Sequence, residues 1–238
     1  VFDKYEFDSV IHFAAFKAVG ESVADPMKYY RNNLLSFMNI IDLMREFGRH
    51  NIVFSSSATV YGEADELPVT EQTPRKPATS SYGNTKQMCE DILRDSVAAY
   101  GGEGLKGIAL RSFNPIGAHP SALIGELPRG VPQNLVPFIT QTAAGVRECL
   151  SVFGDDYNTP DGSCLRDYID VVDLASESTA EPGKALLGYG TWHKCFLKRL
   201  ENTALLGKFA HRKSRRQEEV YITLTCYHAK HMLTWSEI

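Results

Sequence analysis

The 238-residue sequence has no apolar run long enough to cross a membrane, and residues 1–5 lack the charged, apolar and small-residue order of a signal peptide. Its five cysteines show no paired spacing, so we expect reduced thiols rather than a disulfide framework. The composition, 43% hydrophobic and 23% charged, is ordinary for a folded protein of one or two domains. These absences favour a cytoplasmic location and exclude a membrane partner.

The chain also lacks an initial methionine, and it enters an apolar segment almost at once, at residues 8–14. This leads us to expect that the natural amino terminus precedes Val1. Charge is distributed unevenly, because residues 1–175 hold 15 basic and 23 acidic residues whereas residues 176–238 hold 10 and 6. The change of sign predicts a boundary, or a segment of different origin, near Ala175.

Strand and helix patterns alternate through the first half of the chain. Asp25-Pro26 has the pattern of an N-cap followed by proline at the first helical position, and Gly48 is a typical helix end. The expected strands cover residues 8–14, 51–57 and 106–113, and the expected helices cover residues 26–47 and 80–100. This alternation predicts an α/β fold with a doubly wound parallel sheet, whose ligands bind at the carboxyl ends of the strands.

The most informative feature is Tyr82, which is followed four residues later by Lys86. On a helix this spacing puts both side chains on one face, ~6 Å apart along the axis. A phenol titrates near 10, so a base at neutral pH needs a pKa ~3 units lower, which a lysine cation and an oxidised nicotinamide would provide. The run Ser55-Ser56-Ser57 ends the preceding strand, and Ser57 is the natural hydrogen-bond partner. An ordinary packing pair is the alternative for the tyrosine and lysine alone.

These residues lie in blocks that resemble the UDP-glucose 4-epimerases (UDP-galactose 4-epimerases), which belong to the NAD-dependent epimerase/dehydratase family of the extended short-chain dehydrogenase/reductase superfamily. The resemblance covers about residues 7–175. Its blocks are residues 10–14, 17–22, 54–62, 82–86, 111–120, 123–126 and 161–171. A sugar-nucleotide 4,6-dehydratase is expected to carry an Asp-Glu pair after the serine strand, where this chain has Ala58-Thr59.

The resemblance implies a tightly held NAD that takes hydride from the sugar C4 while Tyr82 takes the hydroxyl proton. The 4-keto sugar turns over and hydride returns to its other face, which interconverts UDP-galactose and UDP-glucose in galactose metabolism. Ser57 would hydrogen-bond the reacting oxygen, and Lys86 would lower the tyrosine pKa and hold the nicotinamide ribose.

The same resemblance implies three sets of site residues. The catalytic set is Tyr82, Ser57 and Lys86. The cofactor-binding set is Phe13, Ala14, Ala15, Lys17, Asn32, Ser57, Tyr82, Lys86 and Phe113. The substrate-binding set is Lys17, Ser57, Tyr82, Asn114, Asn134, Leu135, Phe153 and Arg166, with the arginine on the diphosphate and the phenylalanine beside the uridine.

One element of such an enzyme is missing from the sequence. A Rossmann domain holds the cofactor pyrophosphate at a glycine-rich turn before a helix, and an acidic residue further on binds the ribose. We therefore expect residues 1–175 to form a partial NAD-binding domain without its first strands, with part of a UDP-sugar-binding region, and residues 176–238 to form an unmatched basic tail. Weak or absent activity is expected, and the open sheet edge beside residues 10–14 would pair with a partner or aggregate.

Two other interpretations stay open beside an epimerase-like enzyme. The chain would be a non-catalytic Rossmann remnant that binds a partner or a second copy through its sheet edge, or a related NAD-dependent dehydratase or reductase. No metal is expected, because Cys195 near His193, and Cys226 near His228 and His231, lack paired-cysteine spacing. Basic clusters such as Arg212-Lys213 are typical of a solvated face, so no nucleic-acid partner is expected.

Overall fold

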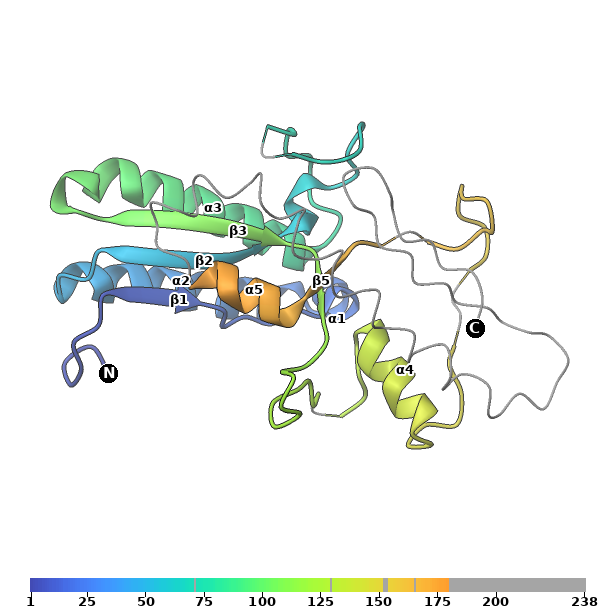
Figure 1. The fold of residues 1–238 in the computed structure, drawn as a ribbon. Coiled ribbons are helices and arrows are strands. Elements are labelled where there is room, and N and C mark those ends of the chain that lie inside the picture. Colours follow the sequence, from blue (N-terminus) through green and yellow to red (C-terminus); the bar gives the residue numbers. More distant parts are fainter. Residues whose placement is uncertain (71, 129, 152–153, 165, 180–238) are drawn as a thin grey trace, which may run out of the picture. The chain divides into compact units, whose positions relative to one another are not determined.

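The structure is a computed structural model that describes residues 1–70, 72–128, 130–151, 154–164 and 166–179 (Figure 1). Phe153 and the predicted tail beyond Thr179, including the cysteine and histidine residues considered for zinc, lie outside these ranges. The described residues divide into two compact units, Val1–Phe113 and Asn114–Thr179, and each is treated by itself. The boundary near Ala175 stays a prediction.

The first unit is built on a three-stranded parallel sheet in the order β1-β2-β3. The strands are β1 (Ser9–His12), β2 (Asn51–Ser57) and β3 (Lys106–Ser112). Figure 1 shows β2 between its two neighbours. The register pairs Ser9 with Asn51 and Ser57 with Ser112, so all three strands point the same way. The α/β class with a parallel sheet, incomplete relative to a whole Rossmann fold, is confirmed.

Two long helices, α2 (Pro26–Glu46) and α3 (Ser81–Tyr100), lie along the sheet (Figure 1). Both begin at side-chain caps, since Asp25 accepts from the Lys28 amide and Ser80 accepts from the Gly83 amide. The core where they meet β2 consists of Phe37, Ile41, Met44, Ile52, Phe54, Cys89, Leu93 and Leu105. This core fixes α3, and with it Tyr82, against the sheet.

Short elements complete the first unit. The helix α1 (Val19–Ala24) precedes α2, and the 3-10 turns η1 (Ala58–Tyr61) and η2 (Gly101–Glu103) follow β2 and α3. The sequence did not predict α1, because it is only six residues long and its N-cap, Ala18, makes no side-chain cap.

The second unit contains a two-stranded parallel sheet of β4 (Asn114–Ile116) and β5 (Tyr168–Asp170). The helix α4 (Leu135–Ala143) lies between these strands in sequence, and α5 (Val171–Ser178) follows them directly. In the part of the chain that the structure describes, no helix is long and apolar enough to cross a membrane.

Candidate active site

Tyr82 and Lys86 lie together on the first turns of α3. Ser80 starts the helix, so Tyr82 falls in its first turn and Lys86 one turn later. The Lys86 Nζ is 5.7 Å from the centre of the Tyr82 ring and 4.9 Å from the centre of the Phe54 ring. Ser57 ends β2, and its side chain acts on the Tyr82 phenol, whose pKa it lowers. The structure therefore brings Ser57, Tyr82 and Lys86 together.

The environment of Tyr82 favours the neutral phenol. Burial raises the pKa of the Tyr82 phenol above its ordinary value of 10, and the hydrogen bond with Ser57 lowers it by less. The expectation that Lys86 and an oxidised nicotinamide together lower this pKa stays a prediction. Desolvation outweighs the hydrogen bond in the chain by itself, so a further positive charge is needed to make Tyr82 a base at neutral pH.

Lys86 is buried, with 5% of its surface exposed. Its Nζ donates to the backbone carbonyl of Ser55 at 2.6 Å. Burial lowers the pKa of the Lys86 ammonium from 10.5 to about 8, and it raises the pKa of the neighbouring Cys89 thiol to about 12. Burial, and then the charge of Lys86, lower the pKa of His12 below 6.5. At neutral pH the lysine is therefore a cation beside a neutral thiol and a neutral imidazole.

A buried amide ties the loop after β1 to the first turns of α3. The Asn33 Oδ1 accepts from the Phe16 amide at 2.9 Å, and the Asn33 Nδ2 donates to the Phe16 carbonyl and to Thr85 Oγ1, both at 3.1 Å. The Thr85 hydroxyl then donates to the Tyr82 carbonyl at 2.7 Å. The sequence analysis missed Asn33, although a polar residue on the buried stripe of Tyr29, Phe37, Ile41 and Met44 was a usable signal.

The helix α1 attaches to the same turn. The Tyr82 amide donates to the Ser22 hydroxyl at 3.1 Å, and that hydroxyl donates to the Val19 carbonyl at 2.7 Å. Ser22 is fully buried. The backbone of Tyr82 is thus held from two sides, through Thr85 and through Ser22.

Most of the other residues predicted to bind the cofactor follow the carboxyl ends of β1 and β3 in sequence, and Asn32 lies on α2. Phe13 is 53% exposed and Phe113 is 39% exposed, which is unusual for side chains of this size. Ala14, Lys17 and Asn32 are exposed and Ala15 is half-buried. The Asn32 Nδ2 donates to the Asn33 Oδ1 at 3.0 Å. Their cofactor role stays a prediction, and their exposure leaves them accessible to a ligand.

The remaining predicted substrate residues belong to the second unit. The Asn114 Nδ2 donates to the Asp167 carbonyl at 2.7 Å, which fixes the start of β4. Asn134 is the N-cap residue of α4, and its Nδ2 lies 3.5 Å from Glu126 Oε1. Leu135 opens α4 and is half-buried, and Arg166 is exposed. These positions do not test the predicted roles.

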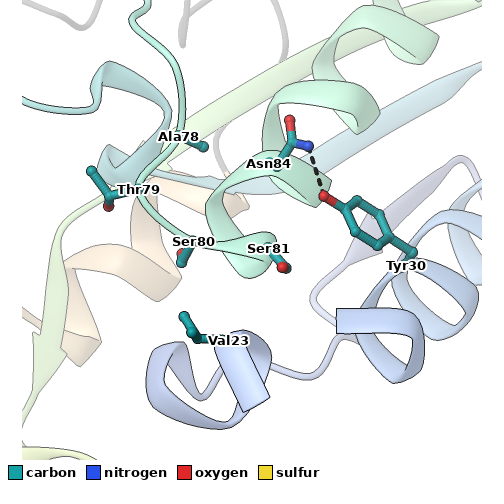
Figure 2. A pocket seen from close by; sticks show the side chains of 7 residues that line it. All are labelled: Val23, Tyr30, Ala78, Thr79, Ser80, Ser81 and Asn84. Carbon is teal, nitrogen blue, oxygen red and sulfur yellow. Dashed lines mark hydrogen bonds between the residues drawn. The ribbon is translucent and has the colours of Figure 1, made fainter. Parts of the chain in front are cut away.

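A separate cavity of about 320 Å³ lies at the start of α3. Figure 2 shows hydroxyl groups of Thr79, Ser80 and Ser81 around it, with Val23 on the opposite side. On another side of its lining, the Asn84 Nδ2 donates to the Tyr30 hydroxyl at 2.7 Å (Figure 2). None of the three predicted catalytic side chains lines this cavity, so it is distinct from the cluster of Ser57, Tyr82 and Lys86.

A parallel sheet with a serine at a strand end, facing a helix that carries tyrosine and lysine four residues apart, defines a Rossmann-like domain of the short-chain dehydrogenase/reductase type. The chain belongs to the family whose model is described as GDP-mannose 4,6 dehydratase, which matches residues 1–226.

Within that family the chain is similar to UDP-glucose 4-epimerases. It is 54% identical to the enzyme of Neisseria meningitidis serogroup B over 180 residues. The aligned region covers 76% of this chain and 52% of the relative. The chain is 50% identical over 175 residues to the enzyme of Homo sapiens, with coverage of 74% and 50%. The predicted resemblance to these epimerases is confirmed, and the chain spans about half the length of these relatives.

Solved structures agree with the sequence comparison. The UDP-glucose 4-epimerase of Bifidobacterium longum in complex with NAD+ and UDP has a TM-score of 0.72 at 50% identity, covering 74% of this chain and 52% of that chain. The UDP-glucose 4-epimerase of Brucella ovis in complex with NAD has a TM-score of 0.69 at 40% identity, with coverage of 85% and 56%.

Proposed function

We propose that the chain is the catalytic part of a UDP-glucose 4-epimerase, which interconverts UDP-galactose and UDP-glucose by NAD-mediated oxidation and re-reduction at the sugar C4. The observation that carries this proposal is the convergence of Ser57, Tyr82 and Lys86 at the end of β2. The similarity to named 4-epimerases supports it. Because the chain spans about half of those relatives, we expect weak or no activity from it alone.

The acid-base steps follow from the three side chains. The Tyr82 hydroxyl, once ionised, takes the proton of the sugar 4-hydroxyl and later returns it, while the Ser57 hydroxyl orients the reacting oxygen. A bound NAD would accept and return the hydride at C4. Since burial raises the pKa of Tyr82, the phenolate requires a cation close by, and Lys86 is mostly protonated at neutral pH.

The residues present suit a nicotinamide ribose. Lys86 carries three N–H donors, one of which is directed to the Ser55 carbonyl, and in this proposal the others donate to ribose hydroxyls. The exposed rings of Phe13 and Phe113 offer apolar surface for a flat ring. In this proposal Ala14, Ala15, Lys17 and Asn32 line the cofactor.

The substrate is the second part of the proposal. Asn114, Asn134, Leu135, Phe153 and Arg166, together with Lys17, are assigned to the UDP-sugar. Arg166 is exposed, and its planar guanidinium matches the geometry of a diphosphate.

Epimerisation is favoured over elimination of water, although the family model carries the name of a dehydratase. The residues that follow Ser57 are Ala58 and Thr59, at the start of η1. Neither can protonate a leaving hydroxyl as a carboxylic acid would. A dehydratase would release a stable keto sugar, whereas an epimerase would not.

The test is titration of NAD into the 238-residue chain with UDP-sugar present, followed by an assay for conversion of UDP-galactose to UDP-glucose. We expect binding and at most weak conversion, and any conversion should fall by about 10²-fold or more in Tyr82→Phe because the acid-base group is removed. Tyr100→Phe, at the far end of the same helix, is the matched control and should keep conversion.

Three results would contradict the proposal. Equal conversion by Tyr82→Phe would exclude the tyrosine base. Release of a keto sugar would indicate the dehydratase. Absence of binding at millimolar NAD would favour a non-catalytic remnant that binds a partner through the β1 edge.

We further propose a cytoplasmic setting and either a homodimer or a strand-edge partner. Free thiols at Cys89, Cys149 and Cys164 support the reducing compartment. The exposed Ile11 on β1 supports an edge that accepts another strand.

A further inference from the structure

Glu90 is a buried carboxylate that the proposed chemistry does not use. It lies on α3, four residues after Lys86 and eight after Tyr82, so the three side chains share one face of the helix. Its side chain is 8% exposed. A charged carboxylate at this depth is costly unless its oxygens are paired, so its presence needs a physical reason.

Three side chains satisfy the Glu90 oxygens. The Ser56 hydroxyl donates to Oε1 at 2.6 Å. Arg111 binds in a fork, with Nε 2.9 Å from Oε1 and Nη2 2.8 Å from Oε2. Arg75 adds a longer contact, with Nη1 3.6 Å from Oε2. A two-point pair of this kind fixes both distance and direction.

The two closest partners of Glu90 come from neighbouring strands. Ser56 on β2 and Arg111 on β3 are register partners in the sheet. Ser56 also directly precedes Ser57. One carboxylate on α3 therefore joins the helix to both strands, one residue before the hydroxyl that acts on Tyr82.

Apolar packing alone does not supply this precision. Besides the Lys86 hydrogen bond to the Ser55 carbonyl, this helix face meets the sheet through Cys89 and Leu93, whose burial is favourable but not directional. Such contacts resist separation of helix and sheet more than they resist small rotations. A shift of ~1 Å at a reacting group can cost ~10²-fold in rate.

We propose that Glu90 is a positioning residue, whose carboxylate fixes α3 against β2 and β3 so that the Tyr82 phenol meets the Ser57 hydroxyl. Its catalytic meaning rests on the proposed function. The geometric statement does not, because the contact between Tyr82 and Ser57 can be measured in the chain without turnover.

The direct test is the NMR signal of the Tyr82 ζ-carbon in chain labelled at that carbon of tyrosine, recorded at neutral pH and assigned by its loss in Tyr82→Phe. This shift responds to the hydrogen bond of the phenol. Glu90→Asp keeps the charge but shortens the reach to Ser56 and Arg111. We expect it to move the signal in the same direction as Ser57→Ala, and the double variant to move it no further.

The matched control is Glu103→Asp, which shortens an exposed glutamate paired with Arg45 at 3.6 Å near the other end of α3. It should leave the Tyr82 signal in place. If Glu90→Asp does not fold, Ser56→Ala removes one bond to the carboxylate and keeps the Arg111 fork. It should move the signal in the same direction by a smaller amount.

Turnover gives an independent measurement. Glu90→Asp should lower kcat by about 10- to 100-fold with KM changed by less than about twofold, because substrate contacts are kept while the reacting groups are displaced. A signal at its wild-type position in the folded Glu90→Asp and Ser56→Ala variants would overturn the proposal. If Glu90→Asp moved the Tyr82 signal as far in the Ser57→Ala background as in the wild type, that result would also overturn the proposal. Conversion that is unchanged in Tyr82→Phe would reject the proposed function, and the NMR result would still decide the role of Glu90.

Discussion

The Lys86 ammonium is buried, and burial disfavours its charged form. Its folded pKa is about 8 and its ordinary pKa is 10.5, so the unfolded chain binds more protons between these values. Below a pH of about 8, Lys86 is protonated in both the folded and the unfolded chain, and the folded chain bears the full cost of burying the charge. As the pH rises from about 8 to 10.5 the folded lysine loses its proton first, and the free energy of unfolding therefore rises.

We therefore expect Lys86→Met to raise the free energy of unfolding by an amount that depends on pH. The burial cost is about 3 kcal/mol, and loss of the bond to Ser55 removes about 1 kcal/mol of this gain, so the variant should be about 2 kcal/mol more stable near neutral pH. Near pH 10.5 the gain should be lost. Urea unfolding at both pH values measures it.

Lys106→Met is the control, because Lys106 is exposed on β3. Its effect on the free energy of unfolding should be small and the same at both pH values. A constant difference between Lys86→Met and the wild type across this range would show that burial does not set the lysine pKa.

At the scale of elements, the contact of α3 with β3 depends on the absence of a side chain at Gly107. A Cβ at that position would lie 2.6 Å from Leu93 Cδ1. Gly107→Ala should therefore push Leu93 and its helix from the sheet and cost about 1–3 kcal/mol.

A double-mutant cycle measures this contact. Leu93→Ala alone should cost about 2–5 kcal/mol through the cavity it leaves. Gly107→Ala should cost less in the Leu93→Ala background than alone, because the new methyl group enters that cavity. Additive losses in urea unfolding would argue that the two residues are not in contact.

The elements differ in how far the sequence could predict them. The helix expected to begin at Asp25-Pro26 begins at Pro26, and the helix expected from Ser80 begins at Ser81, because both starts carry local capping signals. The strand predicted at residues 51–57 is Asn51–Ser57. The strands β4 and β5 have three residues each, too few for a periodic pattern, and they were not predicted.

The features of the candidate site also differ in how far the sequence could predict them. The pairing of Tyr82 with Lys86 follows from helical spacing, and the position of Ser57 follows from the end of a strand. The bonds of Glu90 join residues 34 and 21 positions apart, so only the folded chain shows them. A charged residue on the buried face of α3 was nevertheless a readable signal.

At the scale of the whole molecule, β1 and β3 form the two edges of the main sheet within the described residues. Among these residues, the strand β1 is paired with β2 alone. Ile11 on that edge is 38% exposed and Phe13, just beyond it, is 53% exposed. An apolar edge with unpaired backbone groups favours association with another strand.

Ile11→Lys should therefore reduce association, because a charge on an edge strand opposes pairing between chains. Sedimentation velocity over a range of chain concentrations measures the effect. Val146→Lys makes the same change at a residue that is 71% exposed in the second unit, and it should have little effect. Equal loss of association in both variants would point to net charge rather than to the edge.

The single inward face of α3 has a consequence for how this protein can change over time. Tyr82, Lys86, Cys89, Glu90 and Leu93 occupy that face, so the proposed acid-base chemistry and the structural support share one strip of side chains. Selection for higher stability and selection for faster catalysis would therefore act on the same few residues. A library of single substitutions across residues 81–100 should therefore show intolerance repeating about every 3.6 positions, with little room for one property to drift without the other.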